Sequence, residues 1–194
     1  MRKAYLTAAL LGAALTAAFA TPAQASSTAV AYTVADKDGS VVVYKAATGK
    51  ANRIVVASGP THYISIDDKF PIKAGHGCKA VKGDRTKVLC GVGELTERVR
   101  VSTFDRNDSI TNKTRLKLIA YAGSGNDTVR GATAGDLIYG ESGADTVYGN
   151  GGNDKVYGGS GNDTIYGGAG NDHLIGGSGK DKLRGGSGTD RIVA

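Results

Sequence analysis

The sequence lacks the motifs and long apolar segments that identify common enzyme and membrane classes. It contains no H-E-x-x-H zinc motif and no G-x-S-x-G pentapeptide, which excludes the zinc proteases and hydrolases that these motifs define. Its three histidines, His62, His76 and His173, are too scattered for a zinc pair on one helix. No apolar run beyond the first twenty residues is long enough to cross a bilayer. We therefore expect a protein that is not an enzyme, with no catalytic residues, no cofactor other than a metal ion and no transmembrane segment.

The first 25 residues are predicted to be a secretory signal peptide. Arg2 and Lys3 precede the uncharged apolar run of residues 4–20, and an A-x-A cleavage site ends at Ala25. A membrane anchor is the alternative, but the apolar run is short for a span. We therefore expect a secreted, extracellular protein that begins at Ser26.

Two cysteines, Cys78 and Cys90, lie in the exported part, where a disulfide can persist. Lys82-Gly83-Asp84 lies near the middle of the intervening segment and indicates a turn between two strands. The spacing is too wide for a C-x-x-C site, and no third or fourth metal ligand is nearby. The pattern predicts a structural disulfide.

Charge is divided unevenly along the chain. Residues 26–121 carry a net charge of +7, whereas residues 122–194 carry −3. No arginine-rich helix or aromatic stacking motif supports nucleic-acid binding, and the sequence has no tryptophan. Solubility explains the basic half, and an anionic cell-envelope polymer is a candidate partner for it.

Glycine is concentrated in the second half, where it follows a nine-residue repeat. Of the 30 glycines, 21 lie between residues 122 and 194, in eight consecutive nonapeptides of consensus GGxGxDxUx. Position eight is always aliphatic, as Val129, Ile138, Val147, Val156, Ile165, Leu174, Leu183 and Ile192. Position six is always aspartate, as Asp127, Asp136, Asp145, Asp154, Asp163, Asp172, Asp181 and Asp190.

Each nonapeptide combines a glycine-rich turn with a short strand whose middle residue points inward. Two nonapeptides would make one flattened coil of 18 residues, and the coils would stack at about 4.8 Å. The aliphatic core of such a stack is only one residue wide per strand, so hydrophobic burial is small. The pattern predicts a parallel β-roll that needs another source of stability.

The aspartates are expected to supply that stability by binding a cation. Alternate repeats fall on the same edge of the roll, which gives two columns of four carboxylates. Two such charges about 5 Å apart repel by about 3 kcal/mol at an effective dielectric of 20. A hard cation between successive turns converts the same carboxylates into ligands, and Ca²⁺ accepts irregular oxygen geometry more readily than Mg²⁺. Three gaps per column allow about six Ca²⁺ ions at most.

Repeats such as GGSGNDTIY and GGAGNDHLI resemble the hemolysin-type calcium-binding repeat, also called the RTX nonapeptide. The resemblance implies a parallel β-roll with Ca²⁺ between its turns, held by the eight aspartates and by backbone oxygens. The arrangement of signal, β-rich segment and repeats resembles, more loosely, small secreted calcium-binding proteins of actinobacteria.

Some turns depart from the glycine pattern, which puts calcium binding there in doubt. Ala132 and Ala134 replace glycine in the second repeat, Glu141 in the third and Asn150 in the fourth. Because the turn around Asp163 is complete, replacing Asp163 should weaken calcium binding more than replacing Asp136.

Residues 26–121 read as a separate small β-rich domain, which gives an all-β protein with its β-roll at residues 122–194. Seven apolar runs separated by turn signals predict strands at residues 30–34, 41–44, 54–56, 63–66, 88–92, 99–104 and 116–121. Residues 106–110 echo the repeat one coil earlier and predict a degenerate turn that caps the roll, with Arg106 in place of a glycine. Asp67 and Asp68 are interpreted as a solvated pair, because neighbouring residues of a strand face opposite sides.

The sequence thus predicts a secreted, monomeric, non-enzymatic calcium-binding protein whose roll folds outside the cell. An extracellular enzyme, toxin fragment or adhesin that uses the roll as a stabilising appendage is the alternative. The first half lacks any clustered nucleophile, base or zinc ligand, which argues against an enzyme, whereas an adhesin stays an open alternative.

Overall fold

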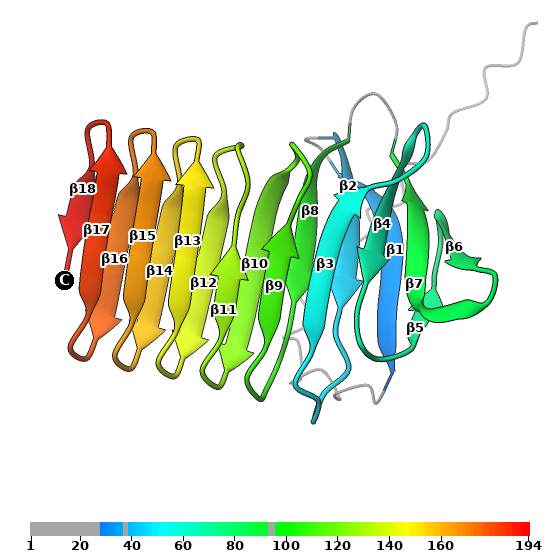
Figure 1. Ribbon diagram of the computed structural model, residues 1–194, viewed down its shortest axis with the longest axis horizontal. Helices are drawn as coiled ribbons and strands as arrows, with labels where there is room; N and C mark the ends of the chain where they lie inside the picture. The colour runs from blue at the N-terminus through cyan, green and yellow to red at the C-terminus, as the bar shows by residue number, and fades with distance from the viewer. Residues whose placement is uncertain (1–27, 37–38, 93–95) are drawn as a thin grey trace, which may run out of the picture.

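The computed structural model describes residues 28–36, 39–92 and 96–194, and within these ranges it contains strands and no helix. The predicted signal peptide lies outside the described residues. Eighteen strands form two nine-stranded sheets that face each other along the whole described length of the molecule (Figure 1). The expected all-β class is confirmed. Since the described residues form no helix, none of them belongs to a helix that could span a membrane.

The repeats form the regular half of this structure, which lies on the left in Figure 1. Successive strands alternate between the two sheets, and strands two apart in the chain pair in parallel. Ile138 lies opposite Val156, and Val147 lies opposite Ile165, so one coil contains two nonapeptides as predicted. The strands of this half are β10 (Lys117–Ser124), β11 (Thr128–Arg130), β12 (Leu137–Ser142), β13 (Thr146–Gly151), β14 (Lys155–Ser160), β15 (Thr164–Ala169), β16 (His173–Ser178), β17 (Lys182–Ser187) and β18 (Arg191–Val193).

The aliphatic residue at position eight of each repeat points between the sheets. Six of these residues, from Val129 to Leu174, have no exposed surface. Leu183 is only partly buried and Ile192 is 47% exposed, because no further strand of the described chain stacks against β17 and β18. The inward orientation that the sequence predicts is therefore confirmed along the roll, and the core thins out over its last coil.

The first half extends the same two sheets. Two coils stack on the roll in parallel: β8 and β9 pair with β10 and β11, and β2 and β3 pair with β8 and β9. The remaining strands complete the right-hand end of Figure 1, where most pairs are antiparallel. The strands of this half are β1 (Ala29–Asp36), β2 (Gly39–Lys45), β3 (Arg53–Ser58), β4 (Tyr63–Asp67), β5 (Ile72–Ala74), β6 (Cys78–Val81), β7 (Asp84–Gly91), β8 (Thr96–Ser102) and β9 (Ser109–Asn112).

All seven predicted strand runs of this half overlap an observed strand, whereas the short strands β5 and β6 were not expected. The predicted turn at residues 106–110 leads into β9, which pairs with the first repeat strand. That turn does not end the stack, because β3 pairs with β9 on its other side. One cluster of buried residues runs through both halves without a break at residue 121. The division into two folding units stays a prediction.

The predicted disulfide between Cys78 and Cys90 is present. It joins β6 to β7 directly across an antiparallel pair, with the two Cα atoms 4.0 Å apart. Gly83 lies in the turn between these strands with φ of +82°, a conformation that glycine adopts without strain. The disulfide therefore fastens the hairpin that lies farthest from the repeats.

Candidate metal centre

The structure places the eight repeat aspartates in two columns, one along each edge of the roll. Each aspartate immediately precedes the strand of its repeat, and strands two apart pair in register. Asp127, Asp145, Asp163 and Asp181 form the first column, and Asp136, Asp154, Asp172 and Asp190 form the second. The first six carboxylates from Asp127 to Asp172 are at most 2% exposed. The aspartates are thus buried turn residues and not a solvated acidic surface.

One carboxylate oxygen of each aspartate links two coils. The backbone N–H of Asp145 donates to Oδ1 of Asp163 at 2.9 Å, and the N–H of Asp154 donates to Oδ1 of Asp172 at the same distance. The same bond recurs along both columns. The carboxylate of each aspartate therefore caps the strand-initiating turn of the preceding coil and holds the two coils at their stacking distance.

The other carboxylate oxygen, Oδ2, is buried without a hydrogen-bond partner in most of the repeats. These unpartnered oxygens belong to Asp127, Asp145, Asp154, Asp163, Asp172 and Asp181. An unpaired buried carboxylate oxygen is costly, because burial removes its water and nothing replaces it. Asp136 is an exception, because its Oδ2 accepts the N–H of Ala132 at 3.0 Å.

The first glycine of each repeat is dictated by this carboxylate. A Cβ atom at Gly149 would lie 2.1 Å from Oδ2 of Asp154, and a Cβ atom at Gly167 would lie 2.2 Å from Oδ2 of Asp172. Neither glycine has positive φ, so the requirement is space and not backbone freedom. The free oxygen, the missing side chain and the nearby carbonyl of the next coil together form a small oxygen-lined site.

Burial raises the pKa of these carboxyl groups above their ordinary value. It raises the pKa of Asp127 and Asp154 to about 7, and that of Asp136 and Asp145 to about 6. The backbone N–H bonds to Oδ1 oppose the shift, and neighbouring aspartates of a column add to it in Asp127, Asp145 and Asp154. Removing the negative charge, by a proton or by a cation, therefore stabilises the turns.

The donor set fits a hard cation that is bound partly by the backbone. No three His, Cys, Asp or Glu side chains of the described residues gather closely enough to hold a metal by themselves. The free oxygens instead recur singly along each edge, beside the carbonyls of glycine-rich turns. Carboxylate and carbonyl oxygens without nitrogen or sulfur suit Ca²⁺, which takes six to eight oxygen ligands in flexible geometry.

The degenerate turns differ in a way that the sequence only partly indicates. Glu141 and Asn150 adopt a positive φ of 74° where most other repeats have a glycine of positive φ, and they carry the strain of that conformation. Ala132 avoids positive φ, and its N–H instead satisfies Oδ2 of Asp136. The second repeat therefore offers no free carboxylate oxygen to a cation.

Sequence reasoning missed a second ladder, which asparagine forms at position five. Oδ1 of Asn126 accepts the N–H of Ala144 at 2.9 Å, and Oδ1 of Asn171 accepts the N–H of Thr189 at 2.8 Å. These bonds run toward the following coil, whereas the aspartate bonds run toward the preceding one. The asparagine before the aspartate in GGxGND was the available signal, because a short amide at a fixed turn position is suited to bonding the backbone.

The interpretation of Asp67 and Asp68 as a solvated pair is wrong for Asp68. Asp68 is 2% exposed; its Oδ2 accepts the hydroxyl of Tyr44 at 2.8 Å, and its Oδ1 accepts the backbone N–H groups of Arg53 and Lys69. Asp67 is partly exposed and forms an ion pair with Lys87 at 3.0 Å. Asp68 directly follows β4 and continues the inward-facing set of Ile64 and Ile66, so the same alternation that leaves Asp67 outside places Asp68 inside.

The comparisons with known proteins agree with this geometry. The model of the RTX calcium-binding nonapeptide repeat (4 copies) matches the chain twice, at residues 121–156 and 157–192. No curated protein and no solved structure matches the chain. Repeats of this family bind calcium, and the parallel β-roll described above is the fold that the resemblance implies. Residues 121–192 therefore contain RTX calcium-binding nonapeptide repeats.

Proposed function

We propose that the protein is a secreted, non-enzymatic calcium-binding protein whose roll folds when it binds Ca²⁺ outside the cell. One observation carries this proposal: the row of buried Oδ2 atoms without partners along both edges of the roll. These oxygens have an energetic reason to take up a cation, and no other group of the described residues is placed to satisfy them.

The proposed ligands are the carboxylates of the eight repeat aspartates and the carbonyl oxygens of their turns. Bound Ca²⁺ would supply positive charge between successive carboxylates and so remove the repulsion within each column. Four aspartates per column leave three gaps, so about six ions are the upper bound. The free Oδ2 atoms support a contribution from most repeats, whereas the bond between Ala132 and Asp136 argues for a weaker site there.

Export is supported by the sequence of residues 1–25 and by the disulfide. A disulfide between Cys78 and Cys90 suits an oxidising compartment. Calcium affinity in the range of extracellular modules, on the order of 10⁻⁴–10⁻³ M, would keep the roll unfolded before export and fold it afterwards. We further propose that the protein is a monomer and that its basic first half contacts an anionic envelope polymer.

A calorimetric calcium titration of the exported protein tests the proposal. We expect several ions to bind cooperatively, because each ion joins two coils and orders the next gap. The same titration with Mg²⁺ is the control, and it should give much weaker heat because Mg²⁺ demands stricter geometry. Absence of saturable Ca²⁺ binding up to 10 times the expected range, roughly 10⁻² M, would overturn the proposal.

A further inference from the structure

The first column of aspartates continues beyond the repeats and ends in an asparagine. The N–H of Asp108 donates to Oδ1 of Asp127 at 2.7 Å, which is the bond that links every later pair. The N–H of Asn52 donates in the same way to Oδ1 of Asp108. Arg53, Ser109 and Thr128 are aligned across β3, β9 and β11, so Asn52 holds the aspartate position of the first coil.

The side chain of Asn52 bonds to oxygens that a cation would otherwise contact. Its Nδ2 donates to Oδ1 of Asp108 at 3.1 Å, to the carbonyl of Lys50 at 2.9 Å and to the carbonyl of Ala47 at 3.3 Å. All three partners are acceptors only, so the amide must present its nitrogen to them. Oδ1 of Asn52 has no partner, which shows that the fold uses the donor end of this side chain.

The two carbonyls lie two and five residues before Asn52. In the repeats, the residues two and five before each aspartate are those of positions four and one, which are glycine in most repeats. An aspartate cannot donate to such carbonyls, because an ionised carboxylate only accepts hydrogen bonds. In the first coil, a neutral N–H group thus stands between a carboxylate and two backbone carbonyls.

Two further residues, Thr103 and Leu118, lie where the proposed metal sites stop at the start of the repeats. Thr103 donates its hydroxyl to the carbonyl of Ala122, which lies five residues before Asp127. In the second column, Leu118 holds the aspartate position, and its N–H donates to Oδ1 of Asp136 at 2.7 Å. Both Thr103 and Leu118 are buried. Before the repeats, a carboxylate therefore recurs only at Asp108, whose Oδ2 is also buried without a partner, whereas Asn52 and Leu118 are uncharged.

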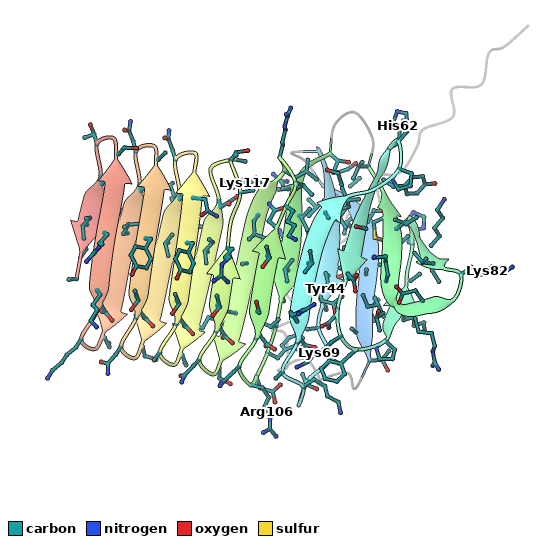
Figure 2. The ribbon with its side chains drawn as sticks, viewed as in Figure 1. Tyr44, His62, Lys69, Lys82, Arg106 and Lys117 are labelled. Carbon is teal, nitrogen blue, oxygen red and sulfur yellow. A yellow bond between two sulfur atoms is a disulfide. The ribbon has the colours of Figure 1, made fainter. Side chains whose placement is uncertain are left out.

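We propose that Asn52 takes the place of a bound cation in the coil of β2 and β3, so that this coil folds without calcium and is the template on which the repeats stack. The proposal rests on the proposed function, since a template is needed only if the repeats require calcium. The position of Asn52 fits this role, because Asn52 lies in the turn that leads into β3. In the neighbouring coil, Arg106 projects outward from the corresponding turn (Figure 2). The coil of β8 and β9 then adds to an edge that is already formed, and the first repeat strand, β11, adds to that coil through β9.

Replacement of Asn52 by aspartate separates this role from a merely structural one. Asn52→Asp removes the donor and adds a second carboxylate beside Asp108, which recreates a repeat turn. Hydrogen exchange of the full exported chain, followed by mass spectrometry, measures protection in β2, β3 and β9. In excess chelator we expect exchange there to be at least tenfold faster than in the unsubstituted protein, and saturating Ca²⁺ should restore protection. Equilibrium dialysis should count one additional bound Ca²⁺.

Asn107→Asp is the matched control. It adds the same charge one residue from Asp108, but Oδ1 of Asn107 accepts the N–H of Asn126 and a carboxylate can do the same. Protection of β2 and β3 in chelator should therefore be unchanged in this variant.

Each remaining outcome counts against the proposal. If Asn52→Asp is as protected in chelator as the unsubstituted protein, the amide does not replace a cation. If it stays unprotected in saturating Ca²⁺, a carboxylate and Ca²⁺ cannot take over the role of the amide, and the proposal also fails. If the unsubstituted repeats show no response to Ca²⁺, the proposed function fails first, which the exchange of β13–β17 reports independently.

Discussion

The two halves of the molecule share their sheets but are stabilised by different interactions. In the repeats, each nonapeptide contributes one buried aliphatic side chain and one buried carboxylate. The first half contains large buried side chains such as Tyr44, Ile54 and Ile66, a disulfide and several antiparallel pairs. The stability of the first half is therefore built into its chain, whereas that of the repeats depends on what neutralises their carboxylates.

If the proposed function holds, one continuous fold contains a part whose folding depends on calcium. The strand ladders run from one half into the other, so the backbone of the two regions is alike. The difference lies in the side chains at the turns: every repeat has aspartate, whereas the coils before the repeats have it only at Asp108 and have asparagine and leucine at Asn52 and Leu118. Under the proposed function, these few positions would decide whether a coil depends on calcium.

The largest expected difference between the two halves is the effect of pH on the stability of the metal-free protein. Burial raises the folded pKa values of Asp127, Asp136, Asp145 and Asp154 to about 6 to 7, above the ordinary aspartate value of 3.8. Groups with raised pKa stabilise the fold below their unfolded pKa and lose that contribution as pH rises through the folded value. Without metal, the repeats should therefore be more stable at pH 5 than at pH 8.

Thermal melts followed by circular dichroism in metal-free buffer measure this dependence. Saturating Ca²⁺ should reverse its direction, because Ca²⁺ binds the ionised carboxylates. A metal-free melting temperature that is higher at pH 8 than at pH 5 would contradict the interpretation.

A second prediction concerns the space that the carboxylates require. In Gly167→Ala the new Cβ would lie 2.2 Å from Oδ2 of Asp172 and 2.6 Å from the carbonyl oxygen of Gly185. Both neighbours are held by the stack, so we expect a loss of about 3 kcal/mol in the stability of the repeats. Urea unfolding in saturating Ca²⁺ measures it.

Gly83→Ala is the control in the first half. No atom lies within 4 Å of the new Cβ, and only the φ of +82° is unfavourable, which costs about 1 kcal/mol. Equal losses in the two variants would show that the repeat glycines are not required by the carboxylates.

The disulfide should matter to one half only. Its two cysteines are 12 residues apart, and closing a loop of that size stabilises the fold by about 3 kcal/mol. The double variant Cys78→Ser, Cys90→Ser should therefore lower the unfolding temperature of the first half and leave the calcium affinity of the repeats unchanged. A tenfold loss of calcium affinity would mean that the two halves fold as one unit.

The smallest of these effects distinguishes two repeats. Oδ2 of Asp163 has no partner, whereas Oδ2 of Asp136 already accepts the N–H of Ala132. Asp163→Asn should weaken Ca²⁺ binding at least tenfold more than Asp136→Asn, and both variants keep an oxygen for the coil-linking bond. Calcium titrations of the two variants measure this difference. Equal losses of calcium affinity would show that a free Oδ2 does not determine how strongly a repeat binds Ca²⁺.

Much of the structure of the repeats could be predicted, because the sequence pattern that determines it is short and recurs in every repeat. The period of nine gives the two columns, and the aliphatic at position eight gives the core from Val129 to Leu174. The disulfide followed from two cysteines on either side of a turn. What these features share is that each depends on residues close together in the chain.

The features that were missed depend on distant residues. Asp68 lies on the inward face with Ile64 and Ile66, but the partner that satisfies it there is Tyr44, 24 residues earlier, and the local sequence does not indicate that bond. Asn52 is 56 residues from Asp108, since the strands from β4 to β8 separate two coils that are neighbours in space. The period breaks at that insertion, so the aspartate position of the first coil could be recognised only from the strand register.

The measurement that tests the central claim most directly is region-resolved hydrogen exchange of the unsubstituted protein with Ca²⁺ and with excess chelator. We predict that chelator accelerates exchange in β13–β17 at least a hundredfold while β2, β3 and β4 stay protected. Protection of β13–β17 that is unchanged in chelator would contradict the account, because the repeats would then be stable without calcium.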